Sequence, residues 1–290
     1  GPPPQLALPP GPGLGLHPRT RRLTMRFALN QKTVKTLPFE AFLDLAAGLG
    51  MVGIEARNDL GRPFFDGIAP VAAGRIVRDR GLRLLGLSEV YPFNHWTPDR
   101  EAAIRDLIET AATAGAETVS LIPSVEPARP VLPLAEAIGR VLPLLDGTEV
   151  VALVEPIGFS TSSVPRKAEA VSVLAALGAG DRVKIVHDTF QHRLAGEVAL
   201  FPAETAMVHI SGISDPDAVF DDDLDKHRVL VDAEDRVGNL DQIRAFLDGG
   251  YQGVFSFECT APEVISRTDP EDAIRRSMAF LQAGTAGFHA

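Results

Sequence analysis

Four consecutive apolar runs in the second half of the chain end in polar side chains that can bind a metal ion. Glu155, Asp188, His209 and Glu258 each stand at or near the end of such a run. A carboxylate at the end of a buried strand loses its hydration, which is unfavourable unless it is paired with a cation or bound to a metal. Few basic residues adjoin these positions in the sequence, so the pattern favours a metal over ion pairs.

Three carboxylates and one imidazole form an oxygen-rich set of ligands. This set suits Mn²⁺, Mg²⁺ or Co²⁺ and also accepts Zn²⁺. Taken singly, a strand-end Asp or Glu is more often the N-cap of the next helix or half of an ion pair. His209 alone is more often a satisfied core histidine than a ligand. The four together predict one metal site.

The runs that carry these residues belong to a longer alternation of strand and helix patterns. Eight short β-branched or apolar runs predict buried strands at Arg26–Asn30, Val52–Ala56, Leu82–Leu87, Thr118–Ile122, Val150–Glu155, Val183–Asp188, Met207–Ile210 and Val254–Glu258. Segments with apolar residues at 3.6-residue spacing predict helices, among them Phe39–Gly50, Pro98–Gly115, Leu134–Leu145, Pro165–Leu177, Leu240–Gly249 and Pro270–Ala283.

Eight strands that alternate with helices over about 250 residues predict a single-domain (β/α)₈ TIM barrel in the α/β class. An open doubly wound sheet is the alternative, and it usually has a glycine-rich turn after its first strand. Here the first strand continues into Asn30-Gln31-Lys32-Thr33, which favours the closed barrel. In such a barrel the C-terminal ends of neighbouring strands, about 4.8 Å apart, bring their side chains to one site.

Composition limits the function classes. The 290 residues carry a net charge of −10, which argues against a nucleic-acid partner. The sequence has no run of about 18 uncharged apolar residues, so we expect no membrane span. Cys259 is the single cysteine, which excludes an intrachain disulfide and fits a reducing cytoplasm. The sequence leaves a homo-oligomer open.

The first 24 residues differ from the rest because they are rich in Pro and Gly and lack periodic apolar positions. Their basic residues come last and prolines break the apolar stretch, so they do not resemble a signal peptide. We interpret residues 1–24 as an extension, such as a tag or a mis-assigned start. The barrel domain is expected over residues 25–290.

Several polar residues outside the group of four are candidates for substrate binding. Arg57 either grips a sugar or pairs with Glu55 or Asp59, and Asn30 either binds a polyol or forms an Asx turn. Asn94 lies in the segment Tyr91–Trp96, which predicts either an aromatic wall for a sugar ring or a plug over the barrel mouth.

Three further features are interpreted as structural. The acidic run from Asp221 to Asp225 predicts a solvated loop rather than a second metal site. Cys259 has no neighbouring His or Asp spacing that would make it a nucleophile. Glycine-rich phosphate loops are absent, so we expect no nucleotide cofactor and do not favour a phosphorylated substrate.

From about Met25 to Leu281 the chain resembles the sugar-phosphate isomerase/epimerase superfamily of xylose-isomerase-like barrels. Within it, the chain is most similar to the inosose (2-keto-myo-inositol) isomerases of inositol catabolism. The residues that carry this resemblance are Phe27–Asn30, Gly53–Arg57, Ala152–Glu155, His187–Phe190, Leu194–Gly196, Val208–Ile210, His227–Val229 and Phe255–Glu258.

The resemblance implies a single divalent ion, with Mn²⁺ favoured, held by Glu155, Asp188, His209 and Glu258. It also implies that the two glutamates form an acid/base pair. The ion acts as a Lewis acid on the carbonyl of a polyol ketone or sugar, and one glutamate removes the neighbouring carbon-bound proton to give a cis-enediolate. Proton return to the other carbon moves the carbonyl by one position, without a redox cofactor.

The chain departs from the superfamily pattern at two places that bear on the substrate. Relatives often have His three residues after the strand-six Asp, whereas this chain has Gln191 there and His192 one place later. A Pro-Gly-x-Gly loop often follows the counterpart of His227-Arg228, whereas this chain continues as Val231–Arg236. Gln191, His192 and Arg228 are therefore candidate substrate-binding residues that affect the choice of sugar.

Three other activities share features with this sequence. A ketose 3-epimerase of the tagatose or psicose type, or a hydroxypyruvate isomerase, would use the same four ligands. An endonuclease IV-like repair enzyme shares the barrel, but its trinuclear zinc site needs more histidines than the seven in this chain. A non-catalytic barrel would have lost a ligand or base, and all four residues are present.

Overall fold

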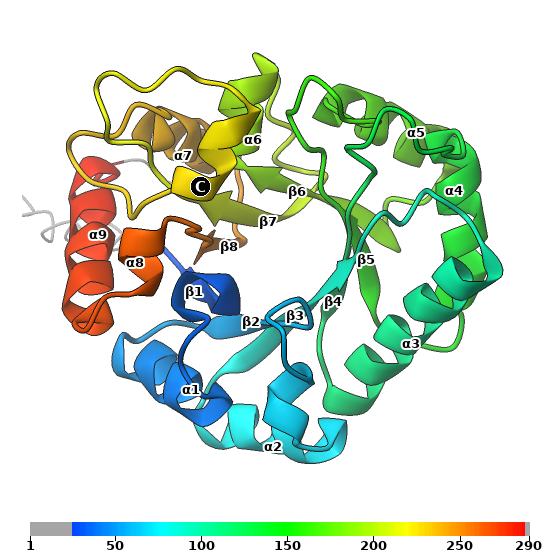
Figure 1. Ribbon diagram of the computed structural model, residues 1–290, viewed down its shortest axis with the longest axis horizontal. Coiled ribbons are helices and arrows are strands. Elements are labelled where there is room, and N and C mark those ends of the chain that lie inside the picture. The colour runs from blue at the N-terminus through cyan, green and yellow to red at the C-terminus, as the bar shows by residue number, and fades with distance from the viewer. Residues whose placement is uncertain (1–24, 288–290) are drawn as a thin grey trace, which may run out of the picture.

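The computed structural model describes residues 25–287, and the predicted extension over residues 1–24 lies outside them. Eight strands form a closed barrel in chain order, with every neighbouring pair parallel, and β1 pairs with β8 to close it (Figure 1). The strands are β1 Phe27–Asn30, β2 Gly53–Arg57, β3 Arg83–Val90, β4 Thr118–Leu121, β5 Val151–Val154, β6 Val183–Asp188, β7 Thr205–Ile210 and β8 Val254–Phe257. The predicted (β/α)₈ TIM barrel is confirmed.

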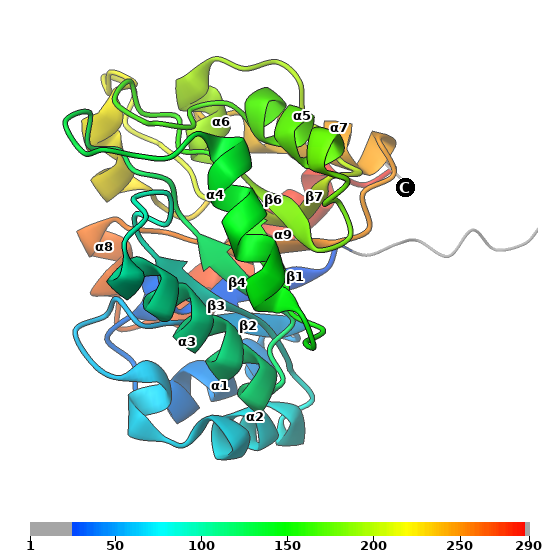
Figure 2. The ribbon, with the colours of Figure 1, turned by 90° about the vertical axis from the view of Figure 1, so that its right-hand side faces the viewer.

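Helices surround the barrel on its outside (Figures 1 and 2). They are α1 Phe39–Gly48, α2 Pro70–Asp79, α3 Pro98–Ala114, α4 Leu134–Val141, α5 Lys167–Leu177, α6 Thr189–Ala195, α7 Asn239–Asp248, α8 Pro262–Ile265 and α9 Pro270–Gly284. Short 3₁₀ turns are η1 Gln31–Val34, η2 Phe64–Gly67, η3 Leu142–Leu145 and η4 Asp222–His227. The helices α2, α6 and α8 were not among the predicted segments, and two of them are only four and seven residues long.

Local sequence explains where α3 and α4 begin and end. The Thr97 side chain accepts a hydrogen bond from the Arg100 amide and caps α3, and Gly115 ends it with a left-handed φ of 75°. The predicted helix 134–145 is instead an α-helix to Val141 followed by η3. Pro143 has no backbone N–H to continue the α-helical pattern, which explains this change.

The strands end so that the four predicted ligands reach one mouth of the barrel. Asp188 is the last residue of β6 and His209 lies opposite it in the register with β7. Glu155 and Glu258 follow directly after β5 and β8. Because all strands are parallel, these positions share the C-terminal end of the barrel.

An apolar layer fills the barrel below this mouth. It consists of Ala28, Leu85, Leu153, Val186, Met207 and Val254, which form one buried cluster. The larger core lies between the strands and the surrounding helices. None of the helices within residues 25–287 combines the length and apolar character that a membrane span requires.

Candidate metal centre

Four ligand-type side chains converge at the C-terminal mouth of the barrel. One ligand atom from each of Glu155, Asp188, His209 and Glu258 lies within 4.8 Å of the others. All four residues are buried, with at most 6% of any of them exposed. This is the one such group of metal-ligating side chains among residues 25–287. Three carboxylates and one imidazole at this spacing fit a single divalent cation.

The two ring nitrogens of His209 have different surroundings. Its Nε2 lies 3.0 Å from Oε1 of Glu55. Its Nδ1 lies 3.3 Å from Oε2 of Glu258 and 3.8 Å from Oε2 of Glu155. This buried Nδ1 has no hydrogen-bond partner among the described residues. A histidine whose far nitrogen donates to a carboxylate and whose near nitrogen faces other ligands is the arrangement found in metal sites.

Glu55 is a buried residue beside the group of four that inspection of the sequence did not include among the site residues. Its Oε2 accepts hydrogen bonds from Ser256 Oγ at 2.5 Å and from Asn30 Nδ2 at 3.3 Å. Burial opposes ionisation of Glu55, but the nearby His209 outweighs it and lowers the pKa of Glu55. The alternation of strand β2 gave a signal, because Glu55 and Arg57 lie two residues apart and therefore share a face.

The charge on His209 follows from the same contacts. Burial alone would lower the pKa of His209, but the carboxylates of Glu55, Glu258 and Glu155 raise it well above its ordinary value. The site thus favours positive charge at Nδ1. A divalent cation bound there would replace a proton among the same carboxylates.

Two arginines contact the carboxylates, so the expectation of few basic partners was wrong. Arg228 donates from Nη1 to Asp188 Oδ2 at 2.6 Å and from Nη2 to Glu258 Oε2 at 3.1 Å. Arg57 donates to Glu258 Oε1 at 2.9 Å and also pairs with Asp59. Both arginines are distant in sequence from their carboxylate partners at the site, which is why inspection of adjacent residues did not find them.

The three carboxyl groups differ in their protonation. Burial raises the pKa of Glu155 to about 7. Burial also raises the pKa of Asp188, although Arg228 partly offsets this effect. Burial opposes ionisation of Glu258 as well, but His209, Arg228 and Arg57 hold the pKa of Glu258 well below its usual range. Two glutamates whose pKa values are driven apart can serve as a proton donor and a proton acceptor.

Asp188 also has a structural role. Its Oδ1 accepts a hydrogen bond from the Gln191 amide at 3.0 Å and caps α6. Asp188 thus caps a helix and forms an ion pair with Arg228, the two roles that are usual for a strand-end Asp, and it also belongs to the group of four. The Gln191 side chain accepts from the Gly158 amide at 2.9 Å and donates to Asp225 at 3.1 Å.

Two predicted substrate-binding residues are not brought into contact with the group of four. His192 lies 2.6 Å from Lys167 Nζ through its Nδ1, and its ring packs against His187. Asn94 donates to Ser163 Oγ at 3.0 Å and accepts from the Ser124 amide at 2.9 Å, so it braces two loops. Three other candidates do lie at the group of four. Arg57 and Arg228 contact its carboxylates, and Asn30 donates to Glu55, which contacts His209.

The remaining sequence features have structural surroundings. Burial raises the pKa of Cys259 to about 12, so its thiol stays protonated and unreactive. The acidic run forms η4, and Asp222 accepts hydrogen bonds from Ser160. In the segment after β3, Phe93 is fully buried and Trp96 stacks with Arg140 at 5.6 Å. These contacts favour the plug over the sugar-binding wall.

Comparison with known proteins supports the fold that carries this site. The model of the family described as xylose isomerase-like TIM barrel matches residues 43–284. A xylose isomerase domain-containing protein from Salmonella typhimurium LT2 is 28% identical over 89% of this chain and 97% of its own, with a TM-score of 0.82. No curated protein sequence matches the chain.

Two more distant structures share the fold. The IolI protein with a bound zinc atom is 17% identical over 92% of this chain and all of its own, with a TM-score of 0.77. D-Psicose 3-epimerase with D-tagatose, from Clostridium cellulolyticum H10, is 13% identical over 92% of this chain and 100% of its own, with a TM-score of 0.67.

Proposed function

Because the chain belongs to the xylose isomerase-like TIM barrel family, we propose that it is a metal-dependent isomerase that moves a carbonyl along a polyol ketone. The observation that carries this proposal is the convergence of Glu155, Asp188, His209 and Glu258 within 4.8 Å at the C-terminal mouth. We propose 2-keto-myo-inositol as the substrate, on the local sequence resemblance to the inosose isomerases.

The four converging residues would hold one divalent ion, with Mn²⁺ favoured. The unpartnered Nδ1 of His209 and the three carboxylates supply the donors for it. When bound, the ion supplies Lewis acidity at the substrate carbonyl. A zinc atom is bound in the IolI protein, and Zn²⁺ and Co²⁺ belong in the same metal screen.

The glutamates would move the proton. Glu155 would take up the carbon-bound proton beside the carbonyl as the general base. Glu258, which ion-pairs with both Arg57 and Arg228, would be the second member of the acid/base pair and would also accept from substrate hydroxyls. Return of the proton to the adjacent carbon shifts the carbonyl by one position, with no net oxidation.

Polar residues around the group would orient the substrate. Arg228 and Arg57 present N–H groups at the mouth. Asn30 lies next to the group of four, where its side-chain amide donates to Glu55. Gln191 lies at the start of α6 beside Asp188 and can donate to a hydroxyl but cannot take up a proton at neutral pH. We assign these four residues to substrate binding, whereas the side chains of Asn94 and His192 bond to Ser163 and Lys167 instead.

The test is product analysis of the metal-loaded protein. The protein with Mn²⁺ and 2-keto-myo-inositol in D₂O should give an isomeric inosose with deuterium at the former carbonyl carbon, observed by NMR. D-tagatose, D-psicose and hydroxypyruvate serve as parallel substrates. Conversion of a ketose to its C3 epimer, without turnover of the inosose, would replace the proposed reaction by 3-epimerisation.

A further inference from the structure

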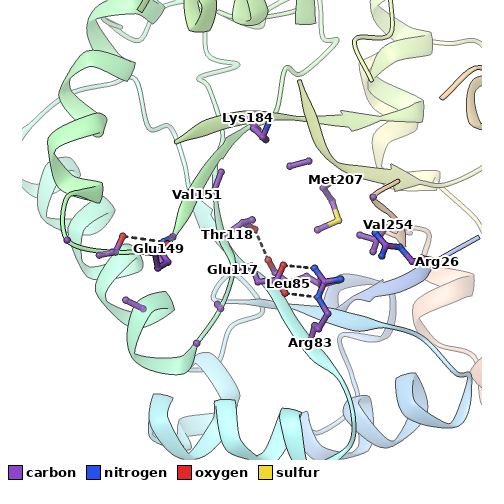
Figure 3. A pocket seen from close by; sticks show the side chains of 18 residues that line it. Arg26, Arg83, Leu85, Glu117, Thr118, Glu149, Val151, Lys184, Met207 and Val254 are labelled. Atoms are coloured by element: carbon purple, nitrogen blue, oxygen red, sulfur yellow. Dashed lines mark hydrogen bonds and ion pairs between the residues drawn. The ribbon is translucent and has the colours of Figure 1, made fainter. Parts of the chain in front are cut away.

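A separate cavity of about 630 Å³ lies at the opposite end of the barrel from the metal centre. Figure 3 shows the labelled side chains of Lys184, Met207, Arg83 and Arg26 arranged around this space. Several of its lining residues are the first residues of their strands, namely Arg83 in β3, Val151 in β5 and Val254 in β8. The cavity is therefore the N-terminal mouth of the barrel.

Lys184 faces the interior of the barrel. Side chains alternate along a strand, so Lys184 and Val186 share the face of β6 that carries Asp188. Asp188 lies four residue steps along the strand from Lys184, about 13 Å at 3.3 Å per step. The apolar layer that includes Val186 and Met207 lies between the two ends. A molecule at this mouth would not touch the metal ligands.

Two of the three cations that line this mouth are not neutralised by carboxylates. Lys184 is half-buried as a residue, and its ammonium has no hydrogen-bond or ion-pair partner within residues 25–287. Arg26 donates to the main-chain carbonyl of Gln252 and forms no ion pair with a described carboxylate. Arg83 is the exception, because Glu117 accepts from its guanidinium at 2.7 and 2.6 Å.

The local charge is opposite to that of the whole protein. The only other carboxylate of the lining, Glu149, is exposed and forms no ion pair with either cation. Two unneutralised cations and one solvated carboxylate leave the mouth positive, although the chain carries a net charge of −10. An anion gains most where a cation has already lost part of its hydration.

Apolar side chains form the other part of the lining. Leu85, Val151, Met207 and Val254 line the cavity next to the cations, and Leu85 and Met207 are almost fully buried. A fully hydrated ion would gain nothing from these surfaces, whereas an apolar group would bury area against them. The volume lies in the range of small-molecule sites.

We propose that the N-terminal mouth binds a small organic anion, namely a carboxylate with an apolar body. The carboxylate lies at Lys184 and Arg26, and the apolar body rests on Met207 and its apolar neighbours. This site is independent of the reaction at the metal centre, so failure of either assignment leaves the other standing.

Octanoate is a suitable probe, because it combines a carboxylate with an apolar chain. The first control is 1-octanol, which has the same chain without the charge. The second control is inorganic phosphate, which has the charge without an apolar body. The sequence has four methionines, which allows methyl-labelled methionine NMR. Octanoate should shift the Met207 methyl signal saturably, whereas Met278 on α9, which does not line the cavity, should not respond. Equal binding of octanol or of phosphate would overturn the proposal, as would the absence of a saturable Met207 shift.

The charge requirement is tested with Lys184→Met, which keeps the length of the side chain. Its octanoate affinity should fall about tenfold or more, as for loss of a hydrogen bond to a charged group. Lys35→Met removes the same charge from an exposed position after η1 and should bind octanoate as the unaltered protein does. Arg26→Met provides a second test at the same mouth if Lys184→Met does not fold. An unchanged octanoate affinity in folded Lys184→Met would refute the site. If Lys184→Met does not fold, an unchanged octanoate affinity in Arg26→Met would refute it.

Discussion

Glu55 on β2 contacts His209 on β7 at 3.0 Å, although β1 and β8 lie between these two strands in the barrel. The gap is bridged by Asn30 and Ser256, which both donate to the other oxygen of Glu55. The glutamate is thus fixed at both oxygens, and it fixes the imidazole in turn. The hydrogen bonds of Asn30, Ser256 and His209 to Glu55 therefore set the direction in which His209 Nδ1 points.

We expect Glu55→Gln to weaken metal binding by about 10- to 100-fold, the usual effect of losing a carboxylate behind a metal-bound histidine. Isothermal titration with Mn²⁺ measures this change. Glu117→Gln at the other end of the barrel is the matched control and should bind Mn²⁺ normally. A normal Mn²⁺ affinity in Glu55→Gln would mean that Glu55 does not position the ligand.

Glu155→Gln and Glu258→Gln should each lose most turnover, because each keeps an oxygen ligand but cannot accept a proton. Loss of a general base reduces the rate by about 10²- to 10⁴-fold. Both variants should still bind Mn²⁺, somewhat more weakly, and should exchange the substrate carbon-bound proton with D₂O more slowly. Near-normal turnover in both would leave the two-glutamate mechanism without support.

Asp188→Asn distinguishes ligand loss from base loss. Asparagine is an equally good N-cap, so α6 should remain intact. The variant should fail through weak metal binding, and excess Mn²⁺ should partly restore its turnover, unlike that of the two Gln variants.

Arg228→Met should bind the divalent ion more tightly than the unaltered protein. The Arg228 guanidinium occupies oxygens of Asp188 and Glu258, and its removal makes the site more negative. Turnover should fall if Arg228 orients the substrate. Lys226→Met, which removes an equal charge from an exposed position in η4, controls for net charge. Weaker Mn²⁺ binding in Arg228→Met than in Lys226→Met would contradict this competition.

The protein should lose stability as the pH falls from about 6.5 toward 4, in part because of His192. Burial and, secondarily, Lys167 lower the pKa of His192 from 6.5 to about 4. Between these values the unfolded state binds the proton and the folded state does not, so acid favours unfolding.

His192→Gln should therefore show a smaller drop in the urea midpoint between pH 7 and pH 4.5 than the unaltered protein. Glutamine can still accept from Lys167 but does not titrate. His95→Gln, at a partly exposed position, is the control. Identical pH dependence in His192→Gln and the unaltered protein would exclude this contribution.

A chain that begins at Met25 should keep its melting temperature and its turnover. The composition of residues 1–24 predicts little buried apolar area and hence little contribution to stability. Differential scanning calorimetry tests this directly. A decrease of more than about 5 °C, which corresponds to over about 1 kcal/mol for a domain of this size, would show that the segment packs on the barrel.

The sequence predicted the barrel because strand and helix periodicities are local and repeat eight times. It also predicted the group of four, because Asp188 and its counterparts stand at strand ends that parallel pairing brings together. Contacts between distant segments were not predictable in this way. Arg228 comes from η4 and its following loop, and Glu55 reaches across the barrel, so no spacing in the chain reveals their partners.

The side-chain contacts of His192 and Asn94 were not predictable for the same reason. His192 follows Asp188 by four residues, and its proximity in the chain suggested a place at the mouth. The short helix α6 instead turns its ring toward Lys167 on α5. Asn94 likewise holds loops together through Ser124 and Ser163.

In the proposed metal centre, Asp188 would satisfy two separate chemical demands with its two oxygens, and this would limit which residues can replace it. A helix cap needs a short side chain, so glutamate is too long, whereas a metal ligand needs a full negative charge, so asparagine and serine are too weak. Aspartate alone meets both demands. When other barrels are screened for this chemistry, an aspartate at the junction of the sixth strand and its helix is therefore a more selective marker than either glutamate, whose position requires only that it reach the ion.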